Sequence, residues 1–287
     1  MGFLNLIFFP LSNFLFKIRG HKLVCTFHLL IFEDDLSKEF FNTFFFLELF
    51  NFKLLIKTLI KYYFKIIFRS IDIGIVHGEY LKNKLITQYN IKSSKIYVIH
   101  HGIRDYSHYI GQNQRFKNYF LYFGYIHKRK NLIKLIKIFL KNNKKLVIAG
   151  IPLDNNLYHK MLNICKDSQN IDILGEVSET DLYNLIYFSN ALIFPYNITM
   201  PGSGPIAIAL GFKKYIFVTK SDYFQEYLKN FDHFINKDLS NLNFEIDQLS
   251  IRKDMHNKVA NKIINEYNWD NYTTKLISLY AKLSKLS

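Results

Sequence analysis

Short apolar runs alternate with amphipathic segments along the whole chain. The runs are bounded by glycine, proline or polar residues, and they predict buried strands of parallel sheets. They lie at 4–9, 22–27, 71–76, 95–99, 119–123, 145–149, 171–174, 191–194 and 215–218. Apolar residues at steps of three and four between the runs predict helices, so we expect an α/β protein with parallel sheets and right-handed crossovers. These helices lie at 40–69, 131–141, 156–165, 179–188, 206–210, 221–229, 251–267 and 269–283.

The stretch 191–219 has a strand, a loop and a helix in an order that builds an anion site. Its apolar run ends at Pro195, which cannot donate to a sheet ladder. Ser203, Gly204 and Pro205 then begin the helical pattern, with Ser203 as the N-cap. Free N–H groups and the positive end of the helix dipole predict phosphate binding there. Because this glycine–serine–glycine loop is a weak signal by itself, an ordinary strand–loop–helix crossover remains the alternative.

The composition indicates a folded chain with anionic partners. Hydrophobic residues make up 49% of the 287 residues, enough for a large core and too many for a disordered chain. Lys and Arg number 38 against 23 Asp and Glu, and this formal net charge of +15 favours nucleic acid, an acidic membrane surface or phosphorylated substrates. A lysine-rich genome composition is the alternative explanation. Since no helix-turn-helix, RRM or zinc pattern is present, nucleic acid is not expected as a partner.

Cysteine and histidine spacing argues against a metal site. Cys25 and Cys165 form no CxxC or disulfide pattern, which predicts free thiols in a cytoplasmic chain. His100 and His101 follow a predicted strand, and adjacent strand residues point to opposite faces of the sheet. The apolar start of the chain, 3–16, is interrupted by polar residues and a proline and is too short to span a bilayer.

The predicted helix at 40–69 combines an apolar and a basic stripe. The apolar stripe consists of Leu49, Phe52, Ile56, Leu59, Tyr63 and Ile67. The basic stripe consists of Lys53, Lys57, Lys61 and Lys65. Such a pair of stripes is typical of a helix that lies on an anionic membrane surface. A helix that packs on the sheet and keeps a hydrated lysine face is the alternative.

Residues that can bind ligands follow several predicted strands. Three glycines, Gly124, Gly150 and Gly175, end strands in the second half, and His28 ends the strand 22–27. The carboxyl ends of parallel strands are where open α/β sheets bind ligands. Lys130 lies where a basic loop meets a helix, within reach of a phosphate.

In this order, the motifs of the second half resemble the nucleotide-binding domain of GT-B glycosyltransferases of the GT4-like (group 1) family. The similarity covers about residues 95–285. It is specific because several motifs occur in the family's order, and no single motif would be sufficient. The matching segments are 122–124 with 130–132, 146–150, 170–177 with 181–182, 191–195 with 203–211 and 217, and 269–280. In the first half, 26–28 is similar to the family's threonine-x-histidine turn and 101–103 to its entry to the linker.

The resemblance implies a GT-B fold, that is, two Rossmann-like domains with parallel sheets. Residues 1–103 would form an incomplete N-terminal, acceptor-side domain, and 104–118 a linker. Residues 119–268 would bind the nucleotide sugar, and 269–287 would form a helix that packs back toward the N-terminal domain. The opening strand and glycine-rich loop of the family lack a counterpart, so the resemblance also implies an N-terminally truncated chain: a fragment, a mis-started reading or half of a split enzyme.

The resemblance also implies the site residues. The family's donor-binding positions fall on Gly124, Lys130, Val177, Gly202, Ser203, Gly204 and Glu226. Lys130 would neutralise the donor diphosphate, and N–H groups at 202–204 would hold its phosphates. Val177 would contact the base through its backbone, and Glu226 would lie near the ribose. His28 would be the catalytic residue that reaches the donor sugar across the interdomain cleft.

The chain departs from the family pattern at three positions. Ile198 and Ile206 stand where glutamates are usual, and Tyr125 stands where an arginine is usual. Ser203-Gly204 is similar to a variant that some members carry in place of the glutamate motif. These departures, with the missing opening strands, favour the alternative of a non-catalytic or degenerate GT-B-like binding subunit.

The activity that the resemblance implies is transfer of a hexose, with retention, from a nucleotide-sugar donor. The acceptor would be a saccharide or lipid-linked sugar in the synthesis of a cell-surface polysaccharide or glycan. The nucleotide sugar is a substrate, and no metal or other cofactor is expected. The chain would work in the cytoplasm, at the membrane surface if the basic stripe 53–65 binds lipid.

Overall fold

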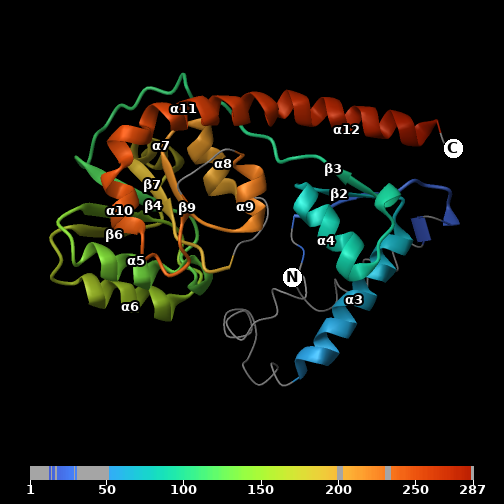
Figure 1. Ribbon diagram of the computed structural model, residues 1–287, viewed down its shortest axis with the longest axis horizontal. Helices are drawn as coiled ribbons and strands as arrows, with labels where there is room; N and C mark the ends of the chain where they lie inside the picture. The colour runs from blue at the N-terminus through green and yellow to red at the C-terminus, as the bar shows by residue number, and fades with distance from the viewer. Residues whose placement is uncertain are drawn as a thin grey trace. The chain divides into compact units, whose positions relative to one another are not determined.

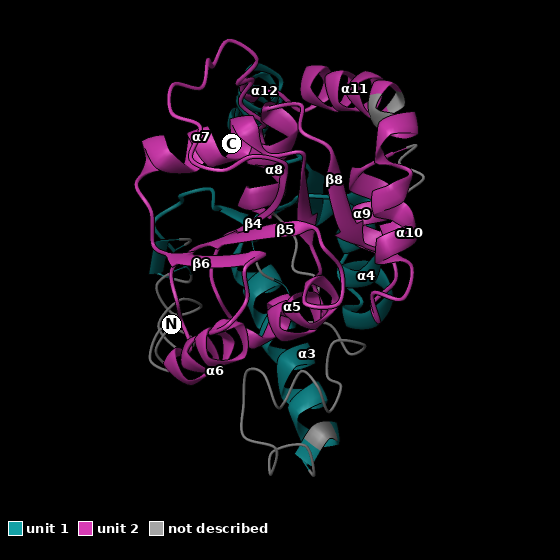
Figure 2. Cartoon of the chain, turned by 90° about the vertical axis from the view of Figure 1, so that its left-hand side faces the viewer, with its two compact units in different colours: residues 1–101, 200–202, 270–287 teal, residues 102–199, 203–269 magenta. Residues whose placement is uncertain are grey.

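The structure, a computed structural model, describes residues 13, 15–16, 18–28, 30, 52–198, 203–229 and 234–285. The chain divides into two compact units (Figure 2). Unit 1 comprises 1–101, 200–202 and 270–287, and unit 2 comprises 102–199 and 203–269. The predicted strand 4–9 and the part of the predicted helix 40–69 that precedes Phe52 lie outside the described residues, as does the side chain of Lys53.

Unit 1 contains a small parallel sheet in the order β1-β2-β3. Its strands are β1 (Val24–Thr26), β2 (Ile73–Val76) and β3 (Ile96–Val98). Its helices are α3 (Lys53–Ser70), α4 (Glu79–Tyr89) and α12 (Trp269–Ser284), of which α12 starts at the last residue of unit 2. The short strands cannot bury both faces alone, so helices must cover them.

Alternate residues of β2 pack against different helices. Ile73 and Ile75 form a buried cluster with Leu279 of α12. Gly74, between them, faces α3 closely enough that a Cβ atom there would lie 2.6 Å from the Phe68 ring. Because side chains alternate across a strand, α3 and α12 cover opposite faces of the sheet.

Unit 2 is built on a six-stranded sheet in the order β6-β5-β4-β7-β8-β9, all parallel (Figure 1). Its strands are β4 (Tyr119–Phe123), β5 (Lys145–Ala149), β6 (Ile171–Gly175), β7 (Ala191–Phe194), β8 (Ile216–Thr219) and β9 (Phe234–Ile235). The first three strands run outward from β4 in one direction and the last three in the other. A topological switch point therefore lies between β4 and β7.

The helices of unit 2 lie on both faces of this sheet. They are α5 (Leu132–Phe139), α6 (Asn155–Cys165), α7 (Glu179–Phe188), α8 (Gly204–Gly211), α9 (Asp222–Tyr227), α10 (Leu242–Asp247) and α11 (Leu249–Glu266). Figures 1 and 2 show α5 and α6 on one face and α7, α8 and α11 on the other. The predicted strands and helices of this half are confirmed, whereas β9 and α10 were not predicted.

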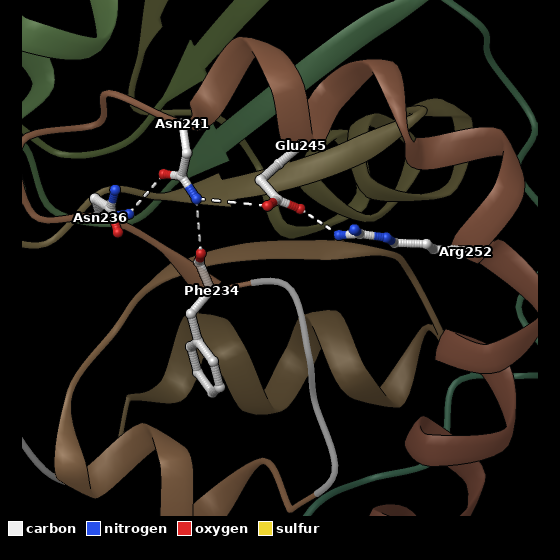
Figure 3. Close-up of polar contacts among 5 residues, drawn as sticks. All are labelled: Phe234, Asn236, Asn241, Glu245 and Arg252. Atoms are coloured by element: carbon white, nitrogen blue, oxygen red, sulfur yellow. Dashed lines mark hydrogen bonds and ion pairs between the residues drawn. The ribbon is translucent and has the colours of Figure 1, made fainter.

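A polar network ties the end of the sheet to the last helices of unit 2 (Figure 3). The Asn241 amide donates to the Phe234 carbonyl of β9 at 3.1 Å and accepts from the Asn236 N–H at 2.8 Å. The same amide donates to Glu245 of α10, which also pairs with Arg252 of α11. Glu245 is buried, so its charge depends on these partners.

Two further predictions concern thiols and membrane spans. Cys25 and Cys165 are free, as predicted. Among the helices that the structure describes, none combines the length and the apolar character needed to cross a bilayer.

Candidate functional site

A pocket of about 250 Å³ opens at the carboxyl ends of β4, β5 and β6 in unit 2. Its lining includes Gly124, Tyr125, Gly150, Ile151, Glu176 and Val177 from the turns after these strands. Pro205 of α8, which follows β7, adds a further wall. The pocket thus lies beside the switch point between β4 and β7, where open parallel sheets bind ligands.

Two glycines keep bare backbone in this pocket. Gly124 has a φ of +121°, a conformation that strongly favours glycine. A Cβ atom at Gly150 would overlap the carbonyl oxygen of Gly124, so the turns after β4 and β5 touch through their backbones. A larger residue at Gly150 would push these turns apart, and one at Gly124 would place its Cβ atom 3.1 Å from the Pro205 ring.

The N-terminus of α8 lies next to this pocket, to which Pro205 contributes. Gly204 is the first residue of α8, and a Cβ atom built on it would meet no atom of the described residues within 4 Å. The prediction that Ser203 caps the helix is correct in position, but its side chain makes no cap hydrogen bond. Instead, its Oγ lies 3.4 Å from the hydroxyl of Tyr196. Within the described residues no side chain caps the first turn of α8, whose N–H groups favour an anion.

Lys130 lies on the other side of Tyr196. It ends the short η4 turn (Lys128–Lys130), is only 3% exposed, and places Nζ 3.3 Å from the centre of the Tyr196 ring. Burial, and then the charge of Arg129, lowers the pKa of Lys130 from 10.5 to about 6. Among the described residues no carboxylate forms an ion pair with it. An anion at this place would restore its charged form.

The loops after β4 and β7 are joined directly. The Asn197 N–H donates to the Arg129 carbonyl at 3.0 Å, which fixes the η4 turn against the loop that leads to α8. Burial raises the pKa of Tyr196 to about 12, so its hydroxyl stays neutral. The same desolvation lowers the pKa of the Arg129 guanidinium, which Tyr196 and Tyr122 partly oppose. Two basic side chains and a helix N-terminus therefore lie around one tyrosine.

The structure brings some predicted site residues together and leaves others apart. Gly124 and Val177 line the pocket, and Lys130 and Ser203 contact the same tyrosine ring and hydroxyl. Glu226 lies in α9 and is not among the residues that line the pocket. Gly202 lies outside the described residues.

His28 belongs to unit 1. It is exposed just beyond the end of β1, and its Nδ1 lies 3.1 Å from Nε2 of His77. Within the described residues no three His, Cys, Asp or Glu side chains are arranged to hold a metal ion. A metal-independent reaction remains a prediction.

Four residues of these surroundings were not predicted. Tyr196, Arg129, Pro205 and His77 contact or adjoin the predicted ones. Tyr196 and His77 each lie at the end of a predicted strand, so the strand-end rule indicated their region. Their pairing with Lys130 and His28 depends on which strands are neighbours, and the sequence pattern leaves this open.

Comparison with known proteins gives structural neighbours only. No protein-family model matches the chain, and no curated protein matches it. A glycosyltransferase from Rickettsia africae is similar with a TM-score of 0.71 and 16% identity, over 96% of this chain and 74% of that one. Anabaena Alr3699/HepE in complex with UDP and glucose is similar with a TM-score of 0.73 and 12% identity, over 96% of this chain and 75% of that one. Sucrose-phosphate synthase from Thermosynechococcus elongatus is similar with a TM-score of 0.69 and 12% identity, over 97% of this chain and 73% of that one.

These neighbours define the fold. The chain has the GT-B architecture of glycosyltransferases. Its described residues form two parallel sheets, of which the N-terminal one is small and has three strands. The predicted fold class is confirmed. At identities this low the likeness concerns the fold, and the activity has to be argued from the site.

Proposed function

We propose that this chain is a glycosyltransferase of the GT4-like kind that transfers a hexose from a nucleotide-sugar donor. The acceptor would be a saccharide or lipid-linked sugar of a cell-surface glycan, and the reaction would retain the anomeric configuration. One observation carries the proposal: a buried lysine without a carboxylate partner among the described residues and Ser203, at an uncapped helix N-terminus, both contact Tyr196. This combination suits a diphosphate, which brings two negative charges to the same place.

The chemistry of such a site is electrostatic. Bond cleavage at the donor sugar leaves a nucleoside diphosphate whose negative charge grows in the transition state. Lys130 and the first-turn N–H groups of α8 would stabilise this charge. The pocket beside Gly124 and Val177 is lined mostly by apolar groups, which suits a flat base. UDP-sugars are the first donors to test, because HepE was crystallised with UDP-glucose.

The second candidate is a binding subunit without transferase activity. It is favoured by Ile198 and Ile206, which stand where the family resemblance places glutamates. Such a subunit would keep the diphosphate site and bind nucleotide without releasing or transferring sugar. Binding and turnover must therefore be measured separately.

Ser203→Trp tests the site. Its indole would fill the space in front of α8, so we expect loss of UDP binding and of sugar release from UDP- and GDP-sugars. Ser203→Ala is the matched control, because the Ser203 side chain makes no cap hydrogen bond, and it should bind as the parent does. Calorimetry gives the binding, and a coupled assay for free diphosphate, with and without membrane lipid extract as acceptor, gives the turnover.

Each outcome of this test decides something. Binding and turnover in the parent, both lost in Ser203→Trp, support the transferase. Binding without turnover supports the binding subunit. Unchanged binding in Ser203→Trp places the nucleotide elsewhere and overturns the assignment of this site.

We also propose that α3 contacts the cytoplasmic surface of an anionic membrane. One side of α3 packs inward through Phe64, Ile67 and Phe68. Another side carries apolar residues that are each more than half exposed, at steps of three and four: Phe52, Leu55, Leu59, Tyr62 and Ile66. Lysines of the predicted basic stripe, Lys57, Lys61 and Lys65, lie on the same helix. Exposed apolar residues with lysines suit an anionic bilayer better than a second copy, because like charges repel between copies.

Charge reversal on α3 tests this contact. Lys61→Glu with Lys65→Glu should lower partition onto phosphatidylglycerol vesicles about tenfold or more, because each basic residue near such a surface contributes about 1 kcal/mol. The matched control is Lys134→Glu with Lys137→Glu on α5, which should sediment with the vesicles as the parent does. Equal sedimentation of both double variants would show that α3 is not the lipid-binding surface.

A further inference from the structure

Each of the three strands that the structure describes in unit 1 is followed by a histidine close to the others. His28 follows β1, His77 follows β2, and His101 follows β3. The His28 and His77 ring centres are 4.8 Å apart, and the His101 ring lies 5.7 Å from that of His77 and 6.4 Å from that of His28. Parallel strands bring their carboxyl ends to one edge of the sheet, which is why residues so far apart in sequence meet here.

His77 is fixed on both sides of its ring. It is 1% exposed, its Nδ1 lies 2.9 Å from the Ile99 carbonyl oxygen, and its Nε2 lies 3.1 Å from Nδ1 of His28. A carbonyl oxygen can only accept a hydrogen bond, so Nδ1 of His77 must carry a hydrogen.

The remaining hydrogens follow from this one. Burial is the largest cause that lowers the pKa of His77, and the neighbouring histidines add to it against the Ile99 hydrogen bond, giving about 4. At neutral pH His77 therefore carries one ring hydrogen, on Nδ1, and its Nε2 is an acceptor. The contact between His77 and His28 needs a hydrogen, and only Nδ1 of His28 can supply it. A neutral His28 then has a bare Nε2.

We propose that His77 is a positioning residue that holds His28 in the Nδ1–H tautomer. Nε2 of His28 is thereby kept as a hydrogen-bond acceptor for a hydroxyl group. Under the proposed function, on which this last step rests, that hydroxyl belongs to a sugar substrate. Without the His77 ring, nothing in the contact fixes which nitrogen of the exposed His28 ring carries the hydrogen.

The first test needs no variant and no ligand. In the full chain with ¹⁵N-labelled histidine at pH 7.5, long-range ¹H–¹⁵N spectra report which ring nitrogens carry hydrogen. We expect His28 and His77 both as Nδ1–H tautomers. A His28 ring that carries its hydrogen on Nε2 in the parent protein would overturn the proposal, whatever any variant does.

His77→Phe then separates positioning from packing. Phenylalanine fills the buried volume but cannot accept a hydrogen bond, so the ¹⁵N signals of His28 should move to a tautomer mixture. His101→Phe is the matched control, because it replaces a neighbouring imidazole by the same phenyl ring without removing the His77 acceptor, and it should leave the His28 tautomer unchanged. A His28 tautomer that stays pure in His77→Phe would contradict the role of His77.

Kinetics test the link to the sugar. A lost hydrogen bond of about 1 kcal/mol predicts that KM for this sugar substrate rises about fivefold in His77→Phe. Binding of UDP alone should not change, because UDP lacks this sugar. A parent with the expected tautomer but no UDP binding would reject the proposed function and leave the histidine pair standing. Equal KM values in the two variants would reject the sugar contact.

Discussion

Lys130→Met is expected to weaken UDP binding about a hundredfold and at the same time to raise the thermal unfolding midpoint by a few degrees. Binding is lost because the diphosphate loses its charged partner beside α8. Stability is gained because the lysine is 3% exposed and unfavourable there, whereas methionine has a similar shape and no charge. Calorimetric titration with UDP and differential scanning calorimetry measure the two effects.

The pH dependence of the stability gain follows from the pKa. The pKa of Lys130 falls from 10.5 in the unfolded chain to about 6 in the folded one, with burial as the largest cause. Between these values the unfolded state binds more protons, so the parent becomes more stable as the pH rises. The gain in Lys130→Met should therefore be largest below about pH 6 and shrink toward pH 10.5.

Proton uptake provides a further signature of the same residue. A bound diphosphate favours the charged form of Lys130, so UDP binding at pH 7.5 should take up close to one proton in the parent. Titrations in buffers with different heats of ionisation measure this number. Lys130→Met should lack this uptake, and Lys137→Met, on the exposed face of α5, should bind and unfold as the parent does. If Lys130→Met binds UDP as tightly as the parent, Lys130 is not part of the site.

Gly204→Glu is expected to bind UDP tenfold to a hundredfold more weakly than Gly204→Gln, because two like charges a few ångströms apart near a protein surface repel by about that much. The two side chains have nearly the same size and point into the same open space in front of α8. Their difference in affinity therefore measures charge alone.

The folded state should tolerate both Gly204 variants. A carboxylate in the first turn of a helix stabilises it by about 0.3–1 kcal/mol, so Gly204→Glu should unfold at the same temperature as Gly204→Gln or higher. A loss of binding without a loss of stability would locate the phosphate at this N-terminus. Equal UDP affinities for the two variants would show that no anion binds there.

The strands of unit 2 were largely predictable from the sequence. In a chain where apolar runs alternate with amphipathic segments, short runs between glycines and prolines indicate buried strands. The bounds of β4, β5 and β7 agree with the runs at 119–123, 145–149 and 191–194. The helix α7 was equally clear, because Ser178 is a typical N-cap residue, and it accepts a hydrogen bond from the Asp181 N–H. In contrast, β9 has two residues and α10 has six, which is too short for a periodic pattern.

The surroundings of the predicted site residues were less predictable. The run Lys128–Lys130 reads as a hydrated loop, whereas Lys130 is buried and lies over the ring of Tyr196. Ser203 is the N-cap residue but makes no cap hydrogen bond, because its hydroxyl lies next to that of Tyr196. Both facts depend on packing between strands that are distant in sequence, which local patterns do not encode.

The most direct test of the diphosphate site is a UDP titration of the ²H,¹⁵N-labelled chain followed by amide resonances. We expect the largest shifts at the amides of Gly124, Val177 and Gly204, which line or adjoin the pocket and the start of α8. Lys130→Met should abolish these shifts at the same UDP concentration. Shifts that leave these three amides unchanged, with saturable changes elsewhere in the chain, would contradict the account.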